Sequence, residues 1–246
     1  MKLPQNLAPL APKGQVVDPR PRYVVMTPAY RGEVSALHVG MNLRLCDRSL
    51  RGGPFRYVGF AYVDSSSLEW ARNRLLSDAM KAPIDWAIFA DADTVWDDAA
   101  GIEAMLLAGA QRGAAIIAAP VKQRGRGGYN ARRVVDTQIF ELPEVDFRGR
   151  VVEADAVGTA FMAINLAWMR EHWADQPWFM FHHLAGDQPQ KLGEDVTFCL
   201  HVRELGGAVY VDGRLEPRHV GATYPVGHPF SESPDRTVPP PWNPPA

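Results

Sequence analysis

The sequence has few cysteines, no long apolar run and no excess of charge of either sign. Its 246 residues include only Cys46 and Cys199, so we expect no disulfide framework, and a reducing, cytoplasmic location fits this usage. Each cysteine is expected to be a small buried apolar residue. The formal net charge is −2 at pH 7, which gives no overall attraction to nucleic acid or to an anionic membrane.

Targeting and membrane signals are also missing from the sequence. Met1 to Pro12 is interrupted by prolines and lacks the apolar stretch of a signal peptide or an anchor. No window approaches the roughly 20 apolar residues that a transmembrane helix needs. No internal repeat is visible. We therefore expect a soluble protein that touches a membrane at most through its surface.

The composition is that of a globular domain with a sizeable core, because 46% of the residues are hydrophobic and 22% are charged. We expect a Pro-rich N-terminal arm (1–22), a single domain (23–224) and a Pro-rich C-terminal tail (225–246). At about residue 120 the pattern of the domain changes, so we divide it into two halves, 23–120 and 121–224.

The first half alternates between apolar runs and helical spacing. We expect strands at 23–26, 55–63, 86–90 and 114–119, and helices at 33–45, 68–80 and 99–110. This alternation predicts a parallel, doubly wound sheet with flanking helices. Ligands bind such sheets at the carboxyl ends of the strands. The turn Thr27-Pro28-Ala29-Tyr30 and the segment Asp91-Ala92-Asp93 both lie there.

The second half is less regular. We expect 134–142 and 150–154 to form the strands of a hairpin, followed by a helix at 194–205 and a strand at 208–211. The segment 122–133 is rich in glycine and arginine. It could close over a diphosphate, contact a nucleic-acid backbone or be a solvated loop.

Three small groups of polar residues carry the chemistry. Asp91 and Asp93 follow an apolar strand, and paired carboxylates can hold a divalent cation, although two aspartates in a turn are common for structural reasons as well. Glu194 and Asp195 open a helix, where the dipole stabilises negative charge and keeps a carboxylate ionised, as a general base requires. His219 follows a strand, and a neutral imidazole can complete a Mn²⁺ site made of carboxylate and phosphate oxygens.

Taken in this order, the segments resemble the GT-A glycosyltransferases, in particular the bacterial and phage members of the family 2-like group. The resemblance covers roughly residues 23 to 221. Its matching stretches are Val25 to Tyr30, Ala71-Arg72-Asn73, Trp86 to Asp93, Val157 to Met162, Gly193 to Leu200 and His219-Val220-Gly221. The resemblance implies the GT-A fold, a Rossmann-like, mostly parallel central sheet with flanking helices.

The family's roles transfer by position. The first half would bind the nucleotide through Thr27, Pro28, Ala29, Tyr30, Arg31, Glu33, Asp64, Arg72, Asp91 and Ala92. Asp93 and His219, with Asp91 as a further candidate, would hold Mn²⁺ or Mg²⁺. Asp195 would be the catalytic base, with Glu194 as second candidate, and Gly158 and Thr159 would line the acceptor side of the second half.

These roles imply a hexosyltransferase-like enzyme that moves a sugar from a nucleotide-diphosphate sugar to an acceptor hydroxyl, with inversion. A UDP-sugar is the first donor to consider. The acceptor is expected to be a glycan, and a hydroxymethylated DNA base is the alternative suggested by the basic loop. The sequence leaves open a nucleotidyltransferase, and also an inactive GT-A domain that acts as a binding or scaffold protein. It does not indicate the oligomeric state.

Overall fold

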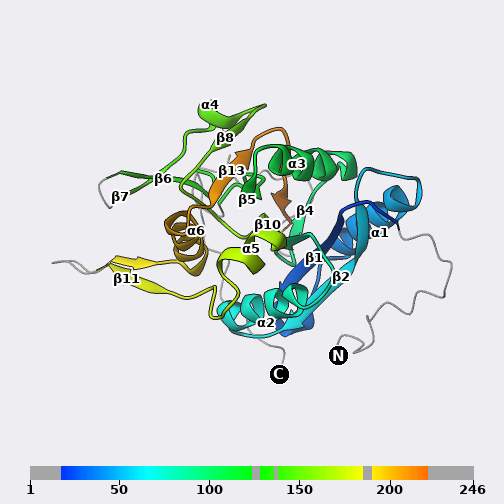
Figure 1. The fold of residues 1–246 in the computed structure, drawn as a ribbon, viewed down its shortest axis with the longest axis horizontal. Coiled ribbons are helices and arrows are strands. Elements are labelled where there is room, and N and C mark those ends of the chain that lie inside the picture. Colours follow the sequence, from blue (N-terminus) through cyan, green and yellow to red (C-terminus); the bar gives the residue numbers. More distant parts are fainter. Residues whose placement is uncertain (1–17, 124–127, 136–137, 185–189, 221–246) are drawn as a thin grey trace, which may run out of the picture.

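The computed structural model describes residues 18–123, 128–135, 138–184 and 190–220. Their main feature is a seven-stranded sheet with helices packed against both faces (Figure 1). The strand order is β2-β1-β3-β10-β5-β13-β8. These strands are β1 (Arg22–Ala29), β2 (Arg56–Asp64), β3 (Trp86–Ala90), β5 (Ala114–Ala118), β8 (Val151–Glu153), β10 (Phe161–Asn165) and β13 (Ala208–Asp212).

The helices are α1 (Ala36–Leu50), α2 (Leu68–Met80), α3 (Ala99–Gln111), α4 (Glu144–Phe147), α5 (Leu166–His172) and α6 (Glu194–Glu204), with a 3₁₀ turn η1 (Tyr30–Gly32). Three smaller ladders complete the described residues. They are formed by β4 (Thr94–Val95) with β14 (Arg218–His219), by β7 (Gln138–Glu141), β6 (Ala131–Val135) and β9 (Ala156–Val157), and by β11 (His182–Leu184) with β12 (Gln190–Leu192).

The central sheet is mostly parallel, as the sequence predicted. Strand β1 pairs in parallel with β2 and β3, and β5 pairs in parallel with β13. Strand β10 lies between β3 and β5 and is antiparallel to both, and β8 is antiparallel to β13 at one edge. The carboxyl ends of β1, β2 and β3 therefore meet at one edge of the sheet, where ligands bind in such folds.

Two hydrophobic cores lie on opposite faces of the sheet, because successive side chains of a strand point to opposite sides. Tyr23 and Val25 of β1 belong to the core that includes Met41 of α1 and Met105 of α3. Val24, which lies between Tyr23 and Val25 in sequence, belongs to the other core, with side chains of α2, α5 and α6. The sheet is thus buried between two helical layers, which accounts for the continuous apolar run of β3.

Several predicted elements agree with the structure to the residue. Helix α2 occupies the predicted range, and the side chain of Ser67 caps it by accepting a hydrogen bond from the backbone nitrogen of Trp70 at 3.2 Å. Strand β3 also occupies its predicted range. Amphipathic spacing with a cap, and an unbroken apolar run, are the patterns that sequence reasoning identifies best.

Helix α1 lies further along the chain than predicted, at 36–50 in place of 33–45. The residues before it form η1 and then an extended link, in which the nitrogen of Ser35 donates to the carbonyl of Ala92 at 2.9 Å. The helix ends near Gly52, whose φ of 88° stops it after an additional turn. The tertiary bond to Ala92 is what delays the helix start, and local sequence does not reveal it.

The predicted hairpin of 134–142 with 150–154 is wrong. Strands β6 and β7 pair with each other, so parts of two strands lie within the range of the first predicted strand. Strand β8 joins the central sheet by pairing with β13. Strand β8 thereby becomes an outer strand of the sheet, and its partner lies more than 50 residues away in sequence, where local patterns cannot identify it.

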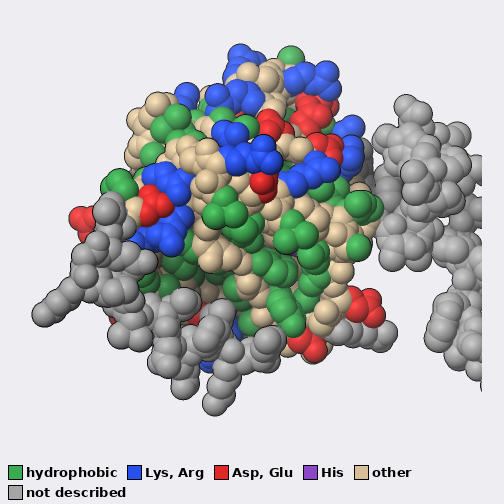
Figure 2. Space-filling model, turned by 90° about the vertical axis from the view of Figure 1, so that its right-hand side faces the viewer, with side chains coloured by type: hydrophobic (Ala, Val, Ile, Leu, Met, Phe, Trp, Pro, Cys, Tyr) green, Lys and Arg blue, Asp and Glu red, His purple; other side chains and the backbone are tan. Residues whose placement is uncertain are grey.

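The face formed by α1 and the edge strand β2 carries many exposed hydrophobic side chains (Figure 2). They are Leu37, Val39, Leu43, Leu50, Val58 and Tyr62. Cys46 is exposed as well, which corrects the expectation that it is buried. It lies in α1 next to Leu45, outside the side of the helix that carries the core-facing residues His38, Met41 and Leu45. Cys199 is buried, as expected.

No helix in the described ranges is both long and apolar enough to cross a bilayer. The N-terminal arm and the C-terminal tail fall almost entirely outside these ranges.

Candidate active site

The nucleotide turn expected after the first strand lies at the carboxyl edge of the sheet. Thr27, Pro28 and Ala29 are buried at the end of β1, and Tyr30 in η1 is 58% exposed. Glu33 is exposed, and the side chain of Arg31 lies outside the described part of the structure. Buried residues thus fix the turn, while an exposed aromatic ring lies beside it.

Asp64 lies next to this turn. It is the last residue of β2, is exposed, and pairs in register with Ala29. Gly32 has a φ of 69°, and a Cβ at this position would be 3.8 Å from the Asp64 carboxyl carbon. The structure therefore brings together Asp64 and the nucleotide turn, which the sequence placed at the ends of different strands.

His38 connects the turn to the Asp-x-Asp segment, and sequence reasoning missed it. Its side chain is fully buried; Nε2 lies 3.0 Å from the hydroxyl of Thr27, and Nδ1 lies 2.7 Å from the carbonyl of Thr94. Burial lowers the pKa of His38, although the bond to Thr94 opposes this effect. A single histidine in a helix gives no sequence signal for such a link.

Asp91, Ala92 and Asp93 form the turn after β3 and are partly exposed. The nitrogen of Asp91 donates to the carbonyl of Ala160 at 3.2 Å, and the nitrogen of Thr94 donates back to the carbonyl of Asp91 at 2.8 Å. This backbone bonding fixes the direction of both aspartates. Their roles then differ, because their side chains contact different partners.

Asp93 faces His219, a residue 126 positions away in sequence. Asp93 Oδ1 and His219 Nδ1 are 3.3 Å apart, and the two side chains are 30% and 17% exposed. The β4–β14 ladder aligns them, since His219 pairs with Thr94 and the nitrogen of Val220 donates to the carbonyl of Asp93 at 2.7 Å.

This pair fits two neighbouring ligands of one cation. Adjacent ligands of an octahedral ion with bonds of about 2.1 Å lie about 3 Å apart. Carboxylate and imidazole are also a donor set that Mn²⁺ accepts. Within the described residues no three His, Cys, Asp or Glu side chains group as a metal site. The described part of the chain therefore offers two ligands, and a bound diphosphate could supply others.

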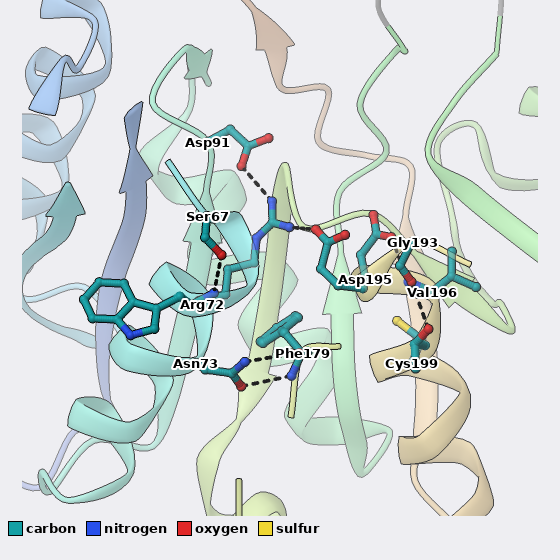
Figure 3. A network of polar contacts seen from close by, with 12 residues as sticks. Ser67, Arg72, Asn73, Asp91, Phe179, Gly193, Asp195, Val196 and Cys199 are labelled. Atoms are coloured by element: carbon teal, nitrogen blue, oxygen red, sulfur yellow. Dashed lines mark hydrogen bonds and ion pairs between the residues drawn. The ribbon is translucent and has the colours of Figure 1, made fainter. Parts of the chain in front are cut away.

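Asp91 contacts Arg72 of α2. The Arg72 side chain is buried, with one terminal nitrogen 3.3 Å from Asp91 Oδ1 and the other bound to the carboxylate of Glu194. Figure 3 shows Arg72 between Asp91 and the first residues of α6. A guanidinium can bind two carboxylates at once because its donors form a rigid fork. The structure thus gathers α2, the end of β3 and α6 around one cation.

Glu194 and Asp195 open α6 as predicted. Glu194 is 7% exposed, and Asp195 Oδ1 accepts a hydrogen bond from the nitrogen of Val196 at 2.8 Å. A Cβ on Gly193 would lie only 2.7 Å from the same oxygen, so glycine leaves room for this carboxylate. Burial raises the pKa of Asp195 above its usual 3.8, while the charge of Arg72 acts in the opposite direction.

No protein-family model matches the chain, and no curated protein matches its sequence. Solved structures do match its fold. A197 from STIV matches with a TM-score of 0.53 and 17% identity, over 81% of this chain and 86% of that one. GalNAc-T7, crystallised with UDP, GalNAc and Mn²⁺, matches with a TM-score of 0.55 and 11% identity, over 83% of this chain and 45% of that one.

The chain has the GT-A fold. This confirms the expected fold class, and at these identities the likeness concerns the fold alone. The described structure brings the Asp-x-Asp turn, His219 and the two acids at the start of α6 to the carboxyl edge of one sheet.

The expected acceptor side adjoins this edge. Thr159 is 2% exposed, and the nitrogen of Gly158 donates to the carbonyl of Asn130 at 2.8 Å. A Cβ on Gly158 would lie 2.7 Å from Asn130 Nδ2, so the close approach of these segments requires glycine. Asn130 also accepts a bond from the nitrogen of Val121 at 2.9 Å, and sequence reasoning missed its linking role.

The basic segment 122–133 is only partly described, because residues 124–127 lie outside the described ranges. Two of its arginines already have acidic partners. Arg132 lies 3.3 Å from Glu141, and Arg133 lies 3.9 Å from Asp155. Their charges are therefore partly compensated within the protein.

Proposed function

We propose that the chain is a metal-dependent glycosyltransferase that moves a sugar from a nucleotide-diphosphate sugar to an acceptor hydroxyl, with inversion. The observation that carries the proposal is the meeting of Asp93 with His219 at 3.3 Å. Two chain segments far apart in sequence place a carboxylate and an imidazole at the edge of the sheet where ligands bind in α/β folds. The acids of α6 supply a base on the same side.

Each residue has a role in this scheme. Tyr30 and Asp64, beside the turn at the end of β1, bind the nucleoside. Asp93 and His219 hold Mn²⁺ or Mg²⁺ together with the donor diphosphate. The ion supplies neutralisation of the negative charge that appears on the diphosphate when the sugar–phosphate bond breaks.

Asp195 takes the proton of the acceptor hydroxyl while that oxygen bonds to the anomeric carbon. The electrons of the sugar–phosphate bond leave with the diphosphate, so one bond forms as another breaks. A partly buried carboxylate with a raised pKa is a stronger base than an exposed aspartate, which favours this role. Attack from the face opposite the leaving group gives inversion.

A UDP-sugar is the first donor to test, because the fold neighbour GalNAc-T7 was crystallised with UDP and Mn²⁺. We propose a glycan as acceptor. A hydroxymethylated DNA base remains the alternative for an activity screen.

The test is thermal unfolding of the full chain with UDP, GDP, CDP and ADP, each with and without Mn²⁺. A ligand present at about 100 times its Kd stabilises the folded state by about 2.7 kcal/mol, which raises Tm by several degrees. We expect a Mn²⁺-dependent rise with one nucleotide in the wild type and its loss in Asp93→Ala. Asp97→Ala is the matched control, because Asp97 is 68% exposed and pairs with Arg218.

Two outcomes would contradict the proposal. If no nucleotide gives a Mn²⁺-dependent rise, the donor site does not exist as described. If a nucleotide binds but no sugar transfer or donor hydrolysis follows, an inactive binding protein explains the fold better. Release of pyrophosphate from a nucleoside triphosphate would instead indicate a nucleotidyltransferase.

A further inference from the structure

We propose that Arg72 is a positioning residue that assigns different roles to the two acids of α6, with Glu194 as the anchor of the helix and Asp195 as the base. This inference rests on the proposed transferase function. It departs from the expectation that Arg72 binds the donor nucleotide.

The position of Arg72 favours a role inside the protein. It lies in the second turn of α2, and the whole residue is only 3% exposed. The next residue of α2 also makes contacts inside the protein, since the amide of Asn73 is bound to the backbone of Trp178 and Phe179. A guanidinium this deeply buried has little surface left for a ligand. Its two terminal nitrogens contact carboxylates within the protein, and its Nε is buried without a hydrogen-bond partner among the described residues.

Those partners come from two other elements. Arg72 binds Glu194, which is 122 residues away, and Asp91 at 3.3 Å (Figure 3). Glu194 is the first residue of α6 and Asp91 follows β3, so Arg72 fixes the start of α6 relative to the Asp-x-Asp turn. Breaking a buried ion pair by removing one partner is costly, and this makes the connection rigid.

The same contacts separate the two acids chemically. The Glu194 carboxylate is nearly inaccessible and bound by a cation, so it is poorly placed to receive a proton from a substrate. Asp195 is more exposed, and among the described residues it has no ion pair within 4 Å. Geometry therefore selects Asp195 as the group that can meet an acceptor hydroxyl.

Arg72 lies near three carboxylates, those of Asp91, Glu194 and Asp195. Among the residues that the structure describes, the charged and titratable groups around Asp195 are Arg72 from α2, Asp91 from the end of β3, and Glu194 and Cys199 from α6 itself. Removing the arginine leaves three negative groups without a cation, which makes Asp195 harder to ionise. Removing the charge of Glu194 has the opposite effect.

The experiment compares Arg72→Gln, Arg72→Lys and Glu194→Gln with Arg74→Gln as matched control, since Arg74 is exposed and pairs with Asp78 in its own helix. The dependence of kcat on pH is measured at saturating donor, and donor affinity is measured separately by calorimetry. We expect Arg72→Gln to move the acid limb of the profile to higher pH and to lower kcat about tenfold at pH 7, with donor affinity within about threefold of wild type.

The two other variants should affect the acid limb differently from Arg72→Gln. Arg72→Lys keeps the charge, so its acid limb stays near that of the wild type. Glu194→Gln stays active and moves the acid limb to lower pH. The proposal is overturned if Arg72→Gln weakens donor binding tenfold or more with an unmoved acid limb, since Arg72 is then a donor ligand. It is equally overturned if Glu194→Gln abolishes transfer at every pH.

A second measurement does not depend on turnover. Carboxyl ¹³C NMR of the full chain, labelled at aspartate and assigned with Asp195→Asn, follows the titration of Asp195 directly. A higher pKa in Arg72→Gln and a lower one in Glu194→Gln support the charge arrangement even if no sugar is transferred. Unchanged titration in both variants refutes the role of Arg72, whatever the reaction is.

Discussion

At the scale of single residues, the start of α6 holds a carboxylate that lowers the stability of the fold and that we propose as the catalytic base. Gly193 leaves the space that the Asp195 carboxylate occupies, and burial then raises the pKa of that carboxylate. A raised pKa means that the folded protein disfavours the charged form relative to the unfolded chain. Asp195 therefore costs stability at neutral pH, which is a common property of functional groups.

Asp195→Asn should consequently raise the free energy of unfolding at pH 7, while it lowers transfer about 100-fold or more because the base is lost. The gain in stability should fade as the pH drops through the folded-state pKa and should be lost below 3.8, where the wild-type carboxyl is protonated in both states. Urea unfolding at several pH values measures this. Asp97→Asn serves as an exposed control, and a less stable Asp195→Asn at pH 7 would contradict the argument.

The partners of these residues show where sequence reasoning stops. The motifs around Asp93, Asp195 and His219 have a recognisable order, so the sequence could nominate them. The contacts of Arg72 could not be predicted, because Glu194 lies 122 residues away and only the fold brings the two together. His38 and Asn130 carry no motif at all, and their buried hydrogen bonds become visible only in three dimensions.

At the scale of elements, α1 is tied to the site through His38. The imidazole lies between the hydroxyl of Thr27 in β1 and the carbonyl of Thr94 in β4, with Trp96 packed edge-on at 5.2 Å. Burial lowers the pKa of His38. The neutral form therefore stabilises the fold, and protonation opposes it.

The lowered pKa of His38 determines how the stability of the fold depends on pH. The stability contributed by neutral His38 is present above pH 6.5 and is lost as pH falls through the lower, folded-state pKa. His38→Gln should be less stable at pH 8 by about 1–3 kcal/mol, because buried partners lose a hydrogen bond. It should also lose less stability than the wild type between pH 8 and pH 5. Parallel curves in urea unfolding would refute the role of His38.

Elements also differ in how well local sequence determines them. Helix α2 begins at a capping serine and keeps one apolar side, so its limits were predictable. Strand β8 was misassigned because three residues can pair with any suitable edge, and the choice of β13 is a tertiary one. The short helix α5, capped by Asn165, was not among the predicted elements, because its seven residues are too few to show a clear helical period.

At the scale of the whole molecule, adjacent residues of α2 join the two halves of the chain. Arg72 reaches α6, and Asn73 makes three hydrogen bonds of 2.7 to 3.0 Å with the backbone of Trp178 and Phe179. Backbone groups in this segment depend on that amide, since Trp178 and Phe179 are buried.

Asn73→Ala should destabilise the protein by about 1–3 kcal/mol, because it leaves buried backbone donors without partners. Nucleotide binding should persist, since the hydrogen bonds of Asn73 within the described ranges go to Trp178 and Phe179 and not to the nucleotide turn. Differential scanning calorimetry and nucleotide titration measure the two effects, with Asn73→Asp to separate loss of the acceptor oxygen from loss of the amide donor. Loss of nucleotide binding without loss of stability would contradict this assignment.

The position of the antiparallel strand β10 in the middle of the sheet affects the order in which strands can pair during synthesis. Strands β1, β2 and β3 can pair with one another as soon as they leave the ribosome, but both neighbours of β5, β10 and β13, lie later in the chain. Until they appear, β3 and β5 expose unpaired edges, which other chains can bind. The edge of β3 and one edge of β5 therefore stay unpaired until residue 165 has been synthesised, and the other edge of β5 until residue 212.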